Sequence, residues 1–184
     1  MKVGFIGLGN VGSKLAKNLI NNDFSLCVLD LNTSLSSSYL KMGAEWAKNP
    51  KELAISCDVI ITCLPSPQAC SAVMEGNDGV IEGLSEGKIW LEMSTTDFEE
   101  VRRIGELVTS ANGKPMDCPV SGGCHRAATG NISIFAGGER KTFERALPVL
   151  KTLGRQILHT GELGSASILK VATNYLATTN LISV

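Results

Sequence analysis

Three glycines near the amino terminus have the spacing that a dinucleotide phosphate requires. Gly7, Gly9 and Gly12 form the pattern G-x-G-x-x-G. The first glycine allows a tight turn, the second lets a pyrophosphate approach the backbone, and the third lets a helix pack closely on a strand. Asp30 follows about twenty residues later, the separation expected for an acid that binds the hydroxyl groups of a ribose. These residue types in this order predict a site for a dinucleotide.

The segments around these residues fit that prediction. The short apolar run 3–6 precedes the glycines and is typical of a buried strand, and apolar residues at helical spacing follow Gly12. The amino terminus of that helix would present free N–H groups and partial positive charge to the phosphates. The run 26–29 predicts a second strand that ends at Asp30. A glycine-rich turn beside a surface aspartate is the simpler alternative, but it does not explain why strand, turn, helix and acid occur in this order.

The residues at and after Asp30 predict NAD as the cofactor and not NADP. A carboxylate accepts hydrogen bonds from the 2′- and 3′-hydroxyls of a ribose and repels a 2′-phosphate. Leu31 and Asn32 provide no arginine that would neutralise such a phosphate. The residues assigned to the cofactor by this motif are Gly7, Leu8, Gly9, Asn10, Val11, Gly12, Asp30, Leu31 and Asn32.

Further along the chain, strand patterns and helix patterns alternate. Helices are predicted at 35–42, 50–56, 68–74, 97–111 and 139–153, and strands at 58–64, 88–93, 114–117, 132–136 and 156–159. The run 58–64 is apolar in its middle, which is typical of a central strand in a parallel sheet. Serial strand–helix units predict an α/β fold of the Rossmann type, a doubly wound, mostly parallel sheet covered on both faces.

A last helix is predicted from Ser165 onward, with Ile168, Leu169 and Ala172 on the side expected to pack on the domain. Its pattern reaches the final residue with neither a C-cap glycine nor a charged residue in the last turn. We therefore expect a cofactor-binding domain over residues 1–164, followed over residues 165–184 by the start of an interdomain helix. The apolar residues late in this helix, Leu176, Leu181 and Ile182, are expected to be exposed in this chain.

The composition is that of a globular protein without a nucleic-acid or membrane partner. The 184 residues are 43% hydrophobic and 19% charged, with a formal net charge of -1. Scattered lysines and arginines give no footprint for nucleic acid, and no apolar run is long enough to span a membrane. Six cysteines without a C-x-x-C pattern, and only two histidines, predict no metal site. Because the first strand begins at residue 2, we expect a cytoplasmic protein, or one of an organelle matrix if a targeting segment was removed.

Three separated motifs together resemble those of the β-hydroxyacid dehydrogenase family. The segment 5–12, FIGLGNVG, resembles the N-terminal signature of that family, and the segment 117–123, DCPVSGG, resembles its substrate-binding motif. The segment 161–165, GELGS, with Lys170 and Asn174, resembles its catalytic motif. The resemblance covers nearly the whole chain. It implies an oxidoreductase that transfers a hydride between NAD and a small 3-hydroxyacid, such as 3-hydroxyisobutyrate or 2-hydroxy-3-oxopropionate (tartronate semialdehyde).

The resemblance also implies a role for each matching residue. Lys170 would be the general acid/base, and Asn174, one helical turn on, would hold the substrate hydroxyl or carboxylate. Ser121, Gly122 and Gly123 would bind the substrate carboxylate through backbone N–H groups and the serine hydroxyl. The residues implied to line the nicotinamide and its ribose are Leu64, Pro65 and Thr95. An all-helical C-terminal domain and a homo-oligomer are implied for the full-length protein.

Three positions depart from the usual pattern of the family. Ala166 stands where a glycine is usual, Thr173 stands where the first of two asparagines is common, and Arg126 stands where a small residue is usual. Arg126 would attract a substrate carboxylate or change which substrate fits, although a surface charge is the simpler explanation for it. No role is predicted for the neighbouring His125.

A second hypothesis is a non-catalytic dinucleotide-binding module in an interaction role. Some relatives in the family have lost the lysine and associate with chromatin, but Lys170 and the absence of a basic tract count against that role here. The imine-reducing relatives also lack the lysine. For this chain alone, we expect Lys170 in a half-built, water-filled pocket where little desolvation lowers its pKa. The chain would then bind NAD without useful turnover.

Overall fold

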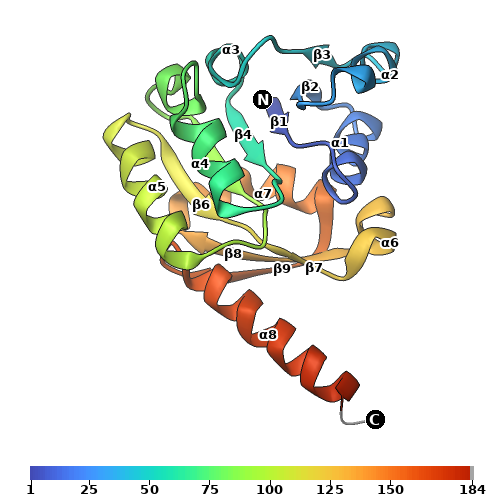
Figure 1. The fold of residues 1–184 in the computed structure, drawn as a ribbon, viewed down its shortest axis with the longest axis vertical. Helices are drawn as coiled ribbons and strands as arrows, with labels where there is room; N and C mark the ends of the chain where they lie inside the picture. Colours follow the sequence, from blue (N-terminus) through green and yellow to red (C-terminus); the bar gives the residue numbers. More distant parts are fainter. Residues whose placement is uncertain (183–184) are drawn as a thin grey trace.

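The computed structural model describes residues 1–182, and within them nine strands form one sheet with helices on both faces (Figure 1). The strands are β1 (Lys2–Ile6), β2 (Ser25–Leu29), β3 (Glu45–Trp46), β4 (Val59–Thr62), β5 (Ile89–Glu92), β6 (Lys114–Asp117), β7 (Val120–Ser121), β8 (Ile132–Gly138) and β9 (Gly154–Gly161). The α-helices are α1 (Gly12–Asn21), α2 (Ser36–Lys41), α3 (Pro50–Ser56), α4 (Pro67–Glu75), α5 (Phe98–Ser110), α6 (Gly123–Ala128), α7 (Arg140–Leu153) and α8 (Ser165–Ile182). Two short 3₁₀ helices are η1 (Thr33–Leu35) and η2 (Val80–Gly83).

The larger part of the sheet has the predicted parallel arrangement. Its strands follow the order β3-β2-β1-β4-β5-β6, and each neighbouring pair is parallel. β4 lies between β1 and β5 with all of its residues buried, which confirms the central position predicted for the run 58–64. The Rossmann-type α/β fold is therefore confirmed.

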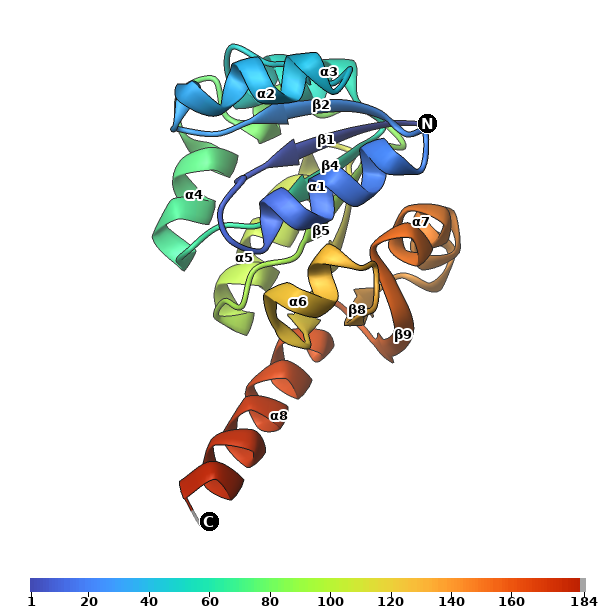
Figure 2. The same ribbon diagram turned by 90° about the vertical axis from the view of Figure 1, so that its right-hand side faces the viewer.

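The remaining strands make one edge of the sheet mixed. β8 runs antiparallel to β6 and β7, and β9 runs parallel to β8. The alternating pattern did not predict this reversal. Its physical reason is that the short helix α6 joins β7 to β8 and lies beside α1, so the chain returns along the neighbouring strand instead of crossing over the sheet (Figure 2).

Alternate residues of β1 show how the sheet divides the core into two layers. Val3 and Phe5 belong to a buried cluster that includes residues of α1 and α7. Ile6 belongs to a second cluster that includes residues of α3, α4 and α5. Because successive strand residues point to opposite faces, β1 buries both of its sides. The carboxyl ends of β1, β2, β4 and β5 are thereby fixed relative to one another.

Several short elements were not predicted, among them β3, β7, α6 and η2. β3 has two residues, and α6 has six residues that begin at Gly123 and bury Ala127 alone. Elements of this length carry too few apolar residues to show a period, so only packing against the rest of the fold reveals them.

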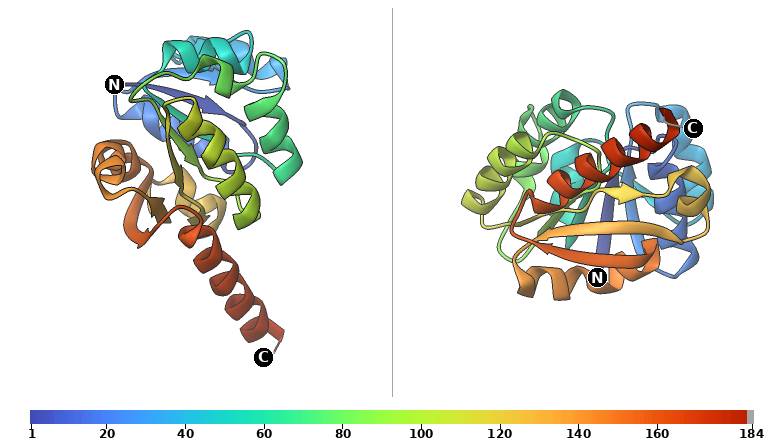
Figure 3. Two further views of the ribbon diagram at one scale, coloured as in Figure 1. Left: turned by 90° about the vertical axis from the view of Figure 1, so that its left-hand side faces the viewer. Right: turned by 90° about the horizontal axis from the view of Figure 1, so that it is seen from below.

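Helix α8 projects from the domain as a single rod (Figures 1 and 3). Its buried residues are Ala166, Ser167 and Lys170. The predicted packing side is therefore wrong for Ile168, which is 54% exposed, and for Ala172, which is exposed. Leu169, the third residue of that side, is half-buried. The exposed large apolar residues of this helix are Ile168, Val171, Tyr175, Leu176, Leu181 and Ile182, which confirms the exposure expected for the last three. Among residues 1–182, no helix combines the length and apolar character needed to cross a membrane.

Candidate functional site

The glycine loop between β1 and α1 has three glycines with three different surroundings. Gly7 has a φ of +98°, and an added Cβ would lie 2.4 Å from the carbonyl oxygen of Cys63. At Gly12 an added Cβ would lie 2.0 Å from the carbonyl oxygen of Gly7, so only glycine lets α1 start this close to the strand. An added Cβ at Gly9 would meet no atom within 4 Å. The loop therefore excludes side chains on its inner side and leaves open space at Gly9.

At the amino terminus of α1, the N–H groups of Asn10, Val11 and Gly12 form no hydrogen bond among the described residues and can bind an anion. Within the described chain, no side chain caps this helix, and its first turn holds no acidic residue. The first N–H groups of a helix lack partners inside the helix and carry partial positive charge. Asn10 is exposed and Val11 is half-buried, so the backbone here is accessible beside Gly9. These features fit a pyrophosphate.

Asp30, one residue beyond β2, is already held by the loop it would serve. Its carboxylate accepts hydrogen bonds from the N–H of Leu8, at 2.6 Å, and from the N–H of Asn32, at 2.8 Å. Each carboxylate oxygen has a further lone pair with which to accept a ribose hydroxyl. Leu31 is fully exposed, and the Asn32 side chain accepts hydrogen bonds from Ser34. The structure thus brings the predicted acid and the predicted loop into direct contact.

Leu64, Pro65 and Thr95 lie just beyond the carboxyl ends of β4 and β5. The N–H of Leu64 donates a hydrogen bond of 2.8 Å to Ser94 Oγ, which ties the two strand ends together. Pro65 and Thr95 are exposed. The next residue, Thr96, has a buried hydroxyl oxygen with no hydrogen-bond partner among the described residues. Since buried polar groups are nearly always hydrogen-bonded, this hydroxyl is available to a bound molecule.

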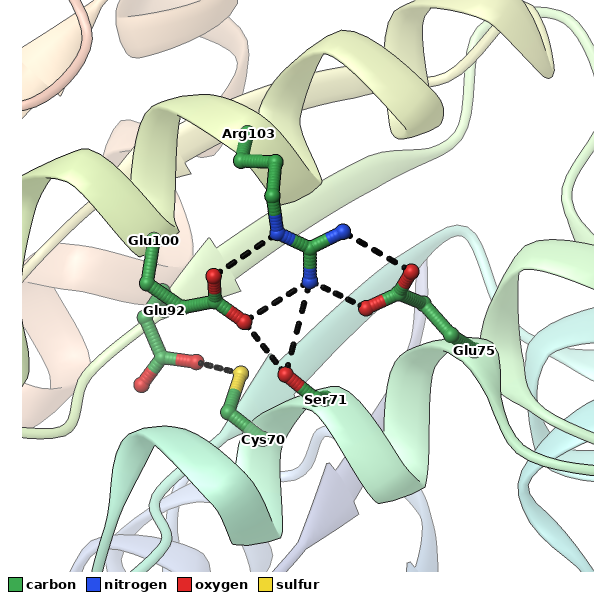
Figure 4. Close-up of polar contacts among 6 residues, drawn as sticks. All are labelled: Cys70, Ser71, Glu75, Glu92, Glu100 and Arg103. Atoms are coloured by element: carbon green, nitrogen blue, oxygen red, sulfur yellow. Dashed lines mark hydrogen bonds and ion pairs between the residues drawn. The ribbon is translucent and has the colours of Figure 1, made fainter.

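A buried carboxylate joins the carboxyl ends of β4 and β5. Glu92 is fully buried at the end of β5 and accepts hydrogen bonds from Thr62 Oγ1 at 2.6 Å and from the N–H of Ser94 at 2.7 Å. Cys70 Sγ also donates to it, at 2.9 Å (Figure 4). Burial raises the pKa of the Glu92 carboxyl. Sequence reasoning missed this residue, although an acid inside the apolar run 88–93 was a signal for it.

An ion-pair cluster on the surface joins α4 to α5 beside this carboxylate (Figure 4). Arg103 donates to Glu100 at 2.7 Å and to Glu75 at 2.9 Å, and Ser71 also donates to Glu100. The guanidinium of Arg103 lowers the pKa of Glu100 to about 2. Exposed pairs such as these contribute little stability singly. Their effect is to hold α4, and with it Cys70, in place over Glu92.

The predicted substrate-binding residues span the junction of β7 and α6. Ser121 ends β7 and is half-buried, and Gly122 and Gly123 are exposed. Both glycines have positive φ, +131° and +76°, so the turn needs residues without a Cβ. An added Cβ on Gly122 would lie 2.8 Å from Arg126 Cδ, which places the arginine side chain directly against this turn.

Asp117 links the substrate-binding motif to α8. It is completely buried at the end of β6. Its carboxylate accepts hydrogen bonds from the N–H of Gly164 at 2.8 Å and from the N–H and hydroxyl of Ser167 at 2.7 and 2.9 Å. An acid at a helix amino terminus satisfies free N–H groups and complements the helix dipole. Asp117 belongs to the segment that resembles the substrate-binding motif, but the sequence alone does not indicate this role.

Lys170 lies one turn after the residues that Asp117 binds. It is only 8% exposed, and burial lowers the pKa of its amine. The expectation of a water-filled pocket with little desolvation is therefore wrong. The reason is that α8 turns Ala166, Ser167 and Lys170 toward the sheet. Among residues 1–182, its ammonium forms no ion pair or hydrogen bond. Asn174, one turn further, is exposed.

Comparison with protein families gives one match that covers most of the chain. The model described as the NAD binding domain of 6-phosphogluconate dehydrogenase matches residues 2–161. The matched segment contains the glycine loop, Asp30 and the substrate-binding motif, and it ends where β9 ends.

Individual proteins show the same likeness. The chain is 34% identical over 182 residues to a probable mitochondrial 3-hydroxyisobutyrate dehydrogenase of Dictyostelium discoideum, an alignment that covers 99% of this chain and 57% of that protein. It is 30% identical over 183 residues to the 2-(hydroxymethyl)glutarate dehydrogenase of Eubacterium barkeri, covering 100% of this chain and 61% of that protein. A structure of 3-hydroxyisobutyrate dehydrogenase from Mycobacterium tuberculosis with L-serine superposes with a TM-score of 0.92 at 27% identity, covering 99% of this chain and 62% of the other. The chain spans about three fifths of the length of these relatives.

Proposed function

Because this chain belongs to the β-hydroxyacid dehydrogenase family, as an NAD(P)-binding domain of the 6-phosphogluconate dehydrogenase type, we propose that its protein transfers a hydride between NAD and a small 3-hydroxyacid. Two relatives are named for such acids, 3-hydroxyisobutyrate and 2-(hydroxymethyl)glutarate. These acids share a 2-(hydroxymethyl) carboxylate and differ in whether carbon 2 carries a methyl or a carboxyethyl group. The observation that carries the proposal is Lys170, buried and unpaired on the helix that Asp117 caps.

The cofactor residues support NAD in particular. Open space at Gly9 and an uncapped α1 leave room for the pyrophosphate, and Asp30 presents a carboxylate to the ribose diol. No arginine stands at position 31 or 32 to neutralise a 2′-phosphate. Beyond the ends of β4 and β5, we assign Leu64, Pro65 and Thr95 to the nicotinamide side, with the free hydroxyl of Thr96 beside them.

The chemistry follows from the state of Lys170. Bound NAD would accept a hydride from the carbinol carbon of the substrate. The substrate hydroxyl must lose its proton in the same step, so a neutral amine is needed beside it. Burial favours the neutral amine of Lys170 because a charged ammonium loses hydration there. We assign Asn174 to the substrate hydroxyl or carboxylate. The turn Ser121-Gly122-Gly123 would hold the carboxylate through its N–H groups and hydroxyl.

We further propose that residues 1–164 form the cofactor domain and that α8 continues toward a helical domain that closes the site. The exposed apolar residues of α8 would then gain a cover, and Asn174 would face a second wall. For the whole protein we expect a homo-oligomer. The chain 1–184 by itself should bind NAD with little turnover, because only one side of the substrate site is present.

A spectrophotometric assay tests the proposal. The full-length protein is incubated with NAD and each of a panel of 3-hydroxyacids, including 3-hydroxyisobutyrate and 2-(hydroxymethyl)glutarate, and NADH is followed. We expect NADH with at least one member of the panel. Tight NAD binding in calorimetry without NADH from any member would instead support a non-catalytic dinucleotide-binding module. The same two measurements on the chain 1–184 should give NAD binding and little NADH.

A further inference from the structure

A cavity of about 660 Å³ lies between α6 and the first residues of β8 and β9. Two arginines, Arg126 and Arg155, line it. The other lining residues include His125, Asn131, Ser133 and Gln156, and no described carboxylate takes part. A cavity of this size holds a small molecule, and amide and hydroxyl groups next to guanidinium groups suit an anionic oxygen ligand.

Neither guanidinium in this cavity is neutralised by the protein. Within residues 1–182, the side chains of Arg126 and Arg155 form no ion pair and no hydrogen bond. Three of the other four arginines do have partners: Arg103 and Arg140 pair with glutamates, and Arg145 donates to a carbonyl oxygen. The fourth, Arg102, has no such partner among residues 1–182 and does not line this cavity. Two unpaired guanidinium groups facing one concave site are therefore available for a ligand.

Strand register connects this cavity to the substrate-binding motif. Ser121 of β7 lies directly opposite Ser133 of β8, and Ser133 lies beside Gln156 of β9. Residues directly opposite each other in a sheet point to the same face. The hydroxyl of Ser133 also donates to the side chain of Gln156, at 3.3 Å. Ser121 therefore stands at one end of a row of three polar residues whose other members line the cavity.

The same face of β8 carries the start of α8. Gly137 lies four residues after Ser133, so an added Cβ would point to the same side. That Cβ would lie 2.9 Å from Ser165 Oγ, at the first residue of α8. Figure 3 shows α8, α6 and the mixed strands together when the molecule is seen from below. The cavity, the carboxylate-binding turn and the helix that carries Lys170 thus share one face.

From this arrangement we propose that the cavity binds a second carboxylate of the substrate, through Arg126 and Arg155. This inference rests on the proposed function. The substrate class would be a dicarboxylic 3-hydroxyacid, with its first carboxylate at the turn Ser121-Gly122-Gly123 and its second on a short arm from carbon 2. The carboxyethyl arm of 2-(hydroxymethyl)glutarate is such an arm, whereas the methyl group of 3-hydroxyisobutyrate leaves both guanidinium groups without a partner.

The short distance between the turn Ser121-Gly122-Gly123 and the cavity favours a carboxylate arm over a sugar phosphate. Directly opposed residues of antiparallel strands have Cα atoms about 4.5–5.5 Å apart. Arg126 itself packs against Gly122, so the cavity begins next to the turn. A two-carbon arm spans this step, whereas the terminal phosphate of a six-carbon sugar acid would be carried further away. A dicarboxylate is therefore the ligand that fits both the charge and the distance.

Binding to the chain itself gives the first test, and it does not depend on turnover. Glutarate, butyrate and inorganic phosphate are titrated in a buffer without other oxyanions, and NMR shifts report the Kd. Glutarate should bind more tightly than butyrate. Arg126→Ala or Arg155→Ala should each weaken glutarate by about tenfold or more, the loss expected for a charge-assisted pair. Lys141→Ala, which removes an exposed charge on α7, should leave the Kd unchanged. Binding of phosphate through these arginines without binding of glutarate would overturn the carboxylate assignment.

Kinetics of the full-length protein gives the second test. The ratio of kcat/KM for 2-(hydroxymethyl)glutarate to kcat/KM for 3-hydroxyisobutyrate should fall by about tenfold in Arg126→Ala and in Arg155→Ala. Lys141→Ala should leave both values unchanged. If 3-hydroxyisobutyrate is oxidised and the ratio does not respond to either arginine, the second-carboxylate site is overturned while the dehydrogenase stands. If no acid of the panel is oxidised but glutarate still binds through both arginines, the dehydrogenase is overturned while the carboxylate site stands.

Discussion

The glycine loop and helix α8 serve the same proposed reaction, yet the chain holds them in different ways. The loop is fixed from within: Gly12 packs on Gly7, and Asp30 binds the N–H of Leu8. Helix α8 is fixed at its first turns by Asp117, and beyond Lys170 its side chains are mostly exposed. The difference teaches that cofactor binding belongs to a locally complete unit. In the proposed reaction, proton transfer would depend on a helix that is anchored at one end.

The largest effect is expected from removal of the Lys170 amine, which should separate proton transfer from cofactor binding. Lys170→Ala in the full-length protein should lower kcat by roughly 10²–10⁴-fold, the loss typical of a missing acid or base. The Kd for NAD should stay within about twofold, because Lys170 lies outside the loop. Steady-state kinetics and calorimetry measure the two quantities, and Lys141→Ala controls for loss of a positive charge. Near-normal turnover would show that Lys170 is not the acid or base. A parallel loss of NAD binding would show that cofactor binding depends on α8 as well as on the glycine loop.

The anchor of α8 should have the next largest effect. Asp117→Ala leaves two N–H groups and one hydroxyl without their acceptor, and hydrogen bonds to charged groups contribute roughly 1.5–3 kcal/mol each. We expect the free energy of unfolding to fall by roughly 4–5 kcal/mol, the lower end of that range for three bonds. Amide exchange should quicken across residues 165–170 before it does so in the glycine loop. Asp97→Ala is the matched control, because Asp97 caps α5 from an exposed position and its loss should cost only about 1 kcal/mol.

Two glycine substitutions sharpen the comparison within the loop. Gly12→Ala forces α1 away from Gly7 and should cost about 1–3 kcal/mol of stability, as overpacking does. Gly9→Ala has open space and should leave the melting temperature of the free chain unchanged while weakening NAD. Thermal unfolding with and without NAD separates the two effects. Equal destabilisation by both changes would show that Gly9 is kept for folding and not for the cofactor.

Cofactor choice is a smaller and more specific effect. Asp30→Ala combined with Asn32→Arg should shift the ratio of Kd values toward NADP by about tenfold, since the acid is lost and a guanidinium is gained for a phosphate. Titration calorimetry with both dinucleotides measures the ratio. Asn32→Arg alone is the control, because it retains Asp30. If the parent chain already binds NADP as tightly as NAD, the role assigned to Asp30 is wrong.

The smallest effect concerns the pH dependence of stability at α8. Because burial lowers the pKa of Lys170 in the folded chain, the unfolded chain binds that proton more tightly. The free energy of unfolding should therefore rise with pH below the ordinary lysine pKa of 10.5, as the folded chain sheds the proton. Lys170→Met removes this contribution and should therefore make the chain more stable than its parent near pH 7. Urea unfolding of both chains from pH 6 to pH 10 measures the difference, which should shrink toward high pH. A constant difference would mean that the amine is equally solvated in both states.

The sequence predicted the strand, turn and helix around the glycine loop well because the determinants of these elements are local. Gly7, Gly9, Gly12 and Asp30 lie within two strands and one helix whose apolar patterns are plain. The exposure of the late α8 residues was also predicted, since their apolar pattern has no partner within the chain. Where residues that are close in sequence are also close in space, residue types and spacing are enough to predict the local structure.

The rest of the site depends on contacts between distant segments. Asp117 binds residues 47 and 50 positions away, and nothing near Asp117 indicates those partners. The side of α8 that carries Lys170 is buried in place of the side that was expected. The reason is that the hydrogen bonds to Asp117, and not the apolar pattern, set the rotation of the helix about its axis. The reversal of β8 and the short helix α6 place Arg126 beside Arg155, which lie far apart in the sequence. Contacts between distant segments leave no periodic pattern in the sequence from which they could be predicted.

The hydrogen bond between Asp30 and the N–H of Leu8 also bears on how this lineage can change. The carboxylate is oriented before any ribose arrives, so binding does not spend side-chain entropy on it. The same bond makes the acid part of the loop's own architecture. A descendant that adopts a 2′-phosphorylated cofactor must therefore rebuild the support of its phosphate loop as well as remove a negative charge. If the cofactor is NAD, as proposed, a change to NADP would then need two steps, and the protein between them would bind neither dinucleotide well.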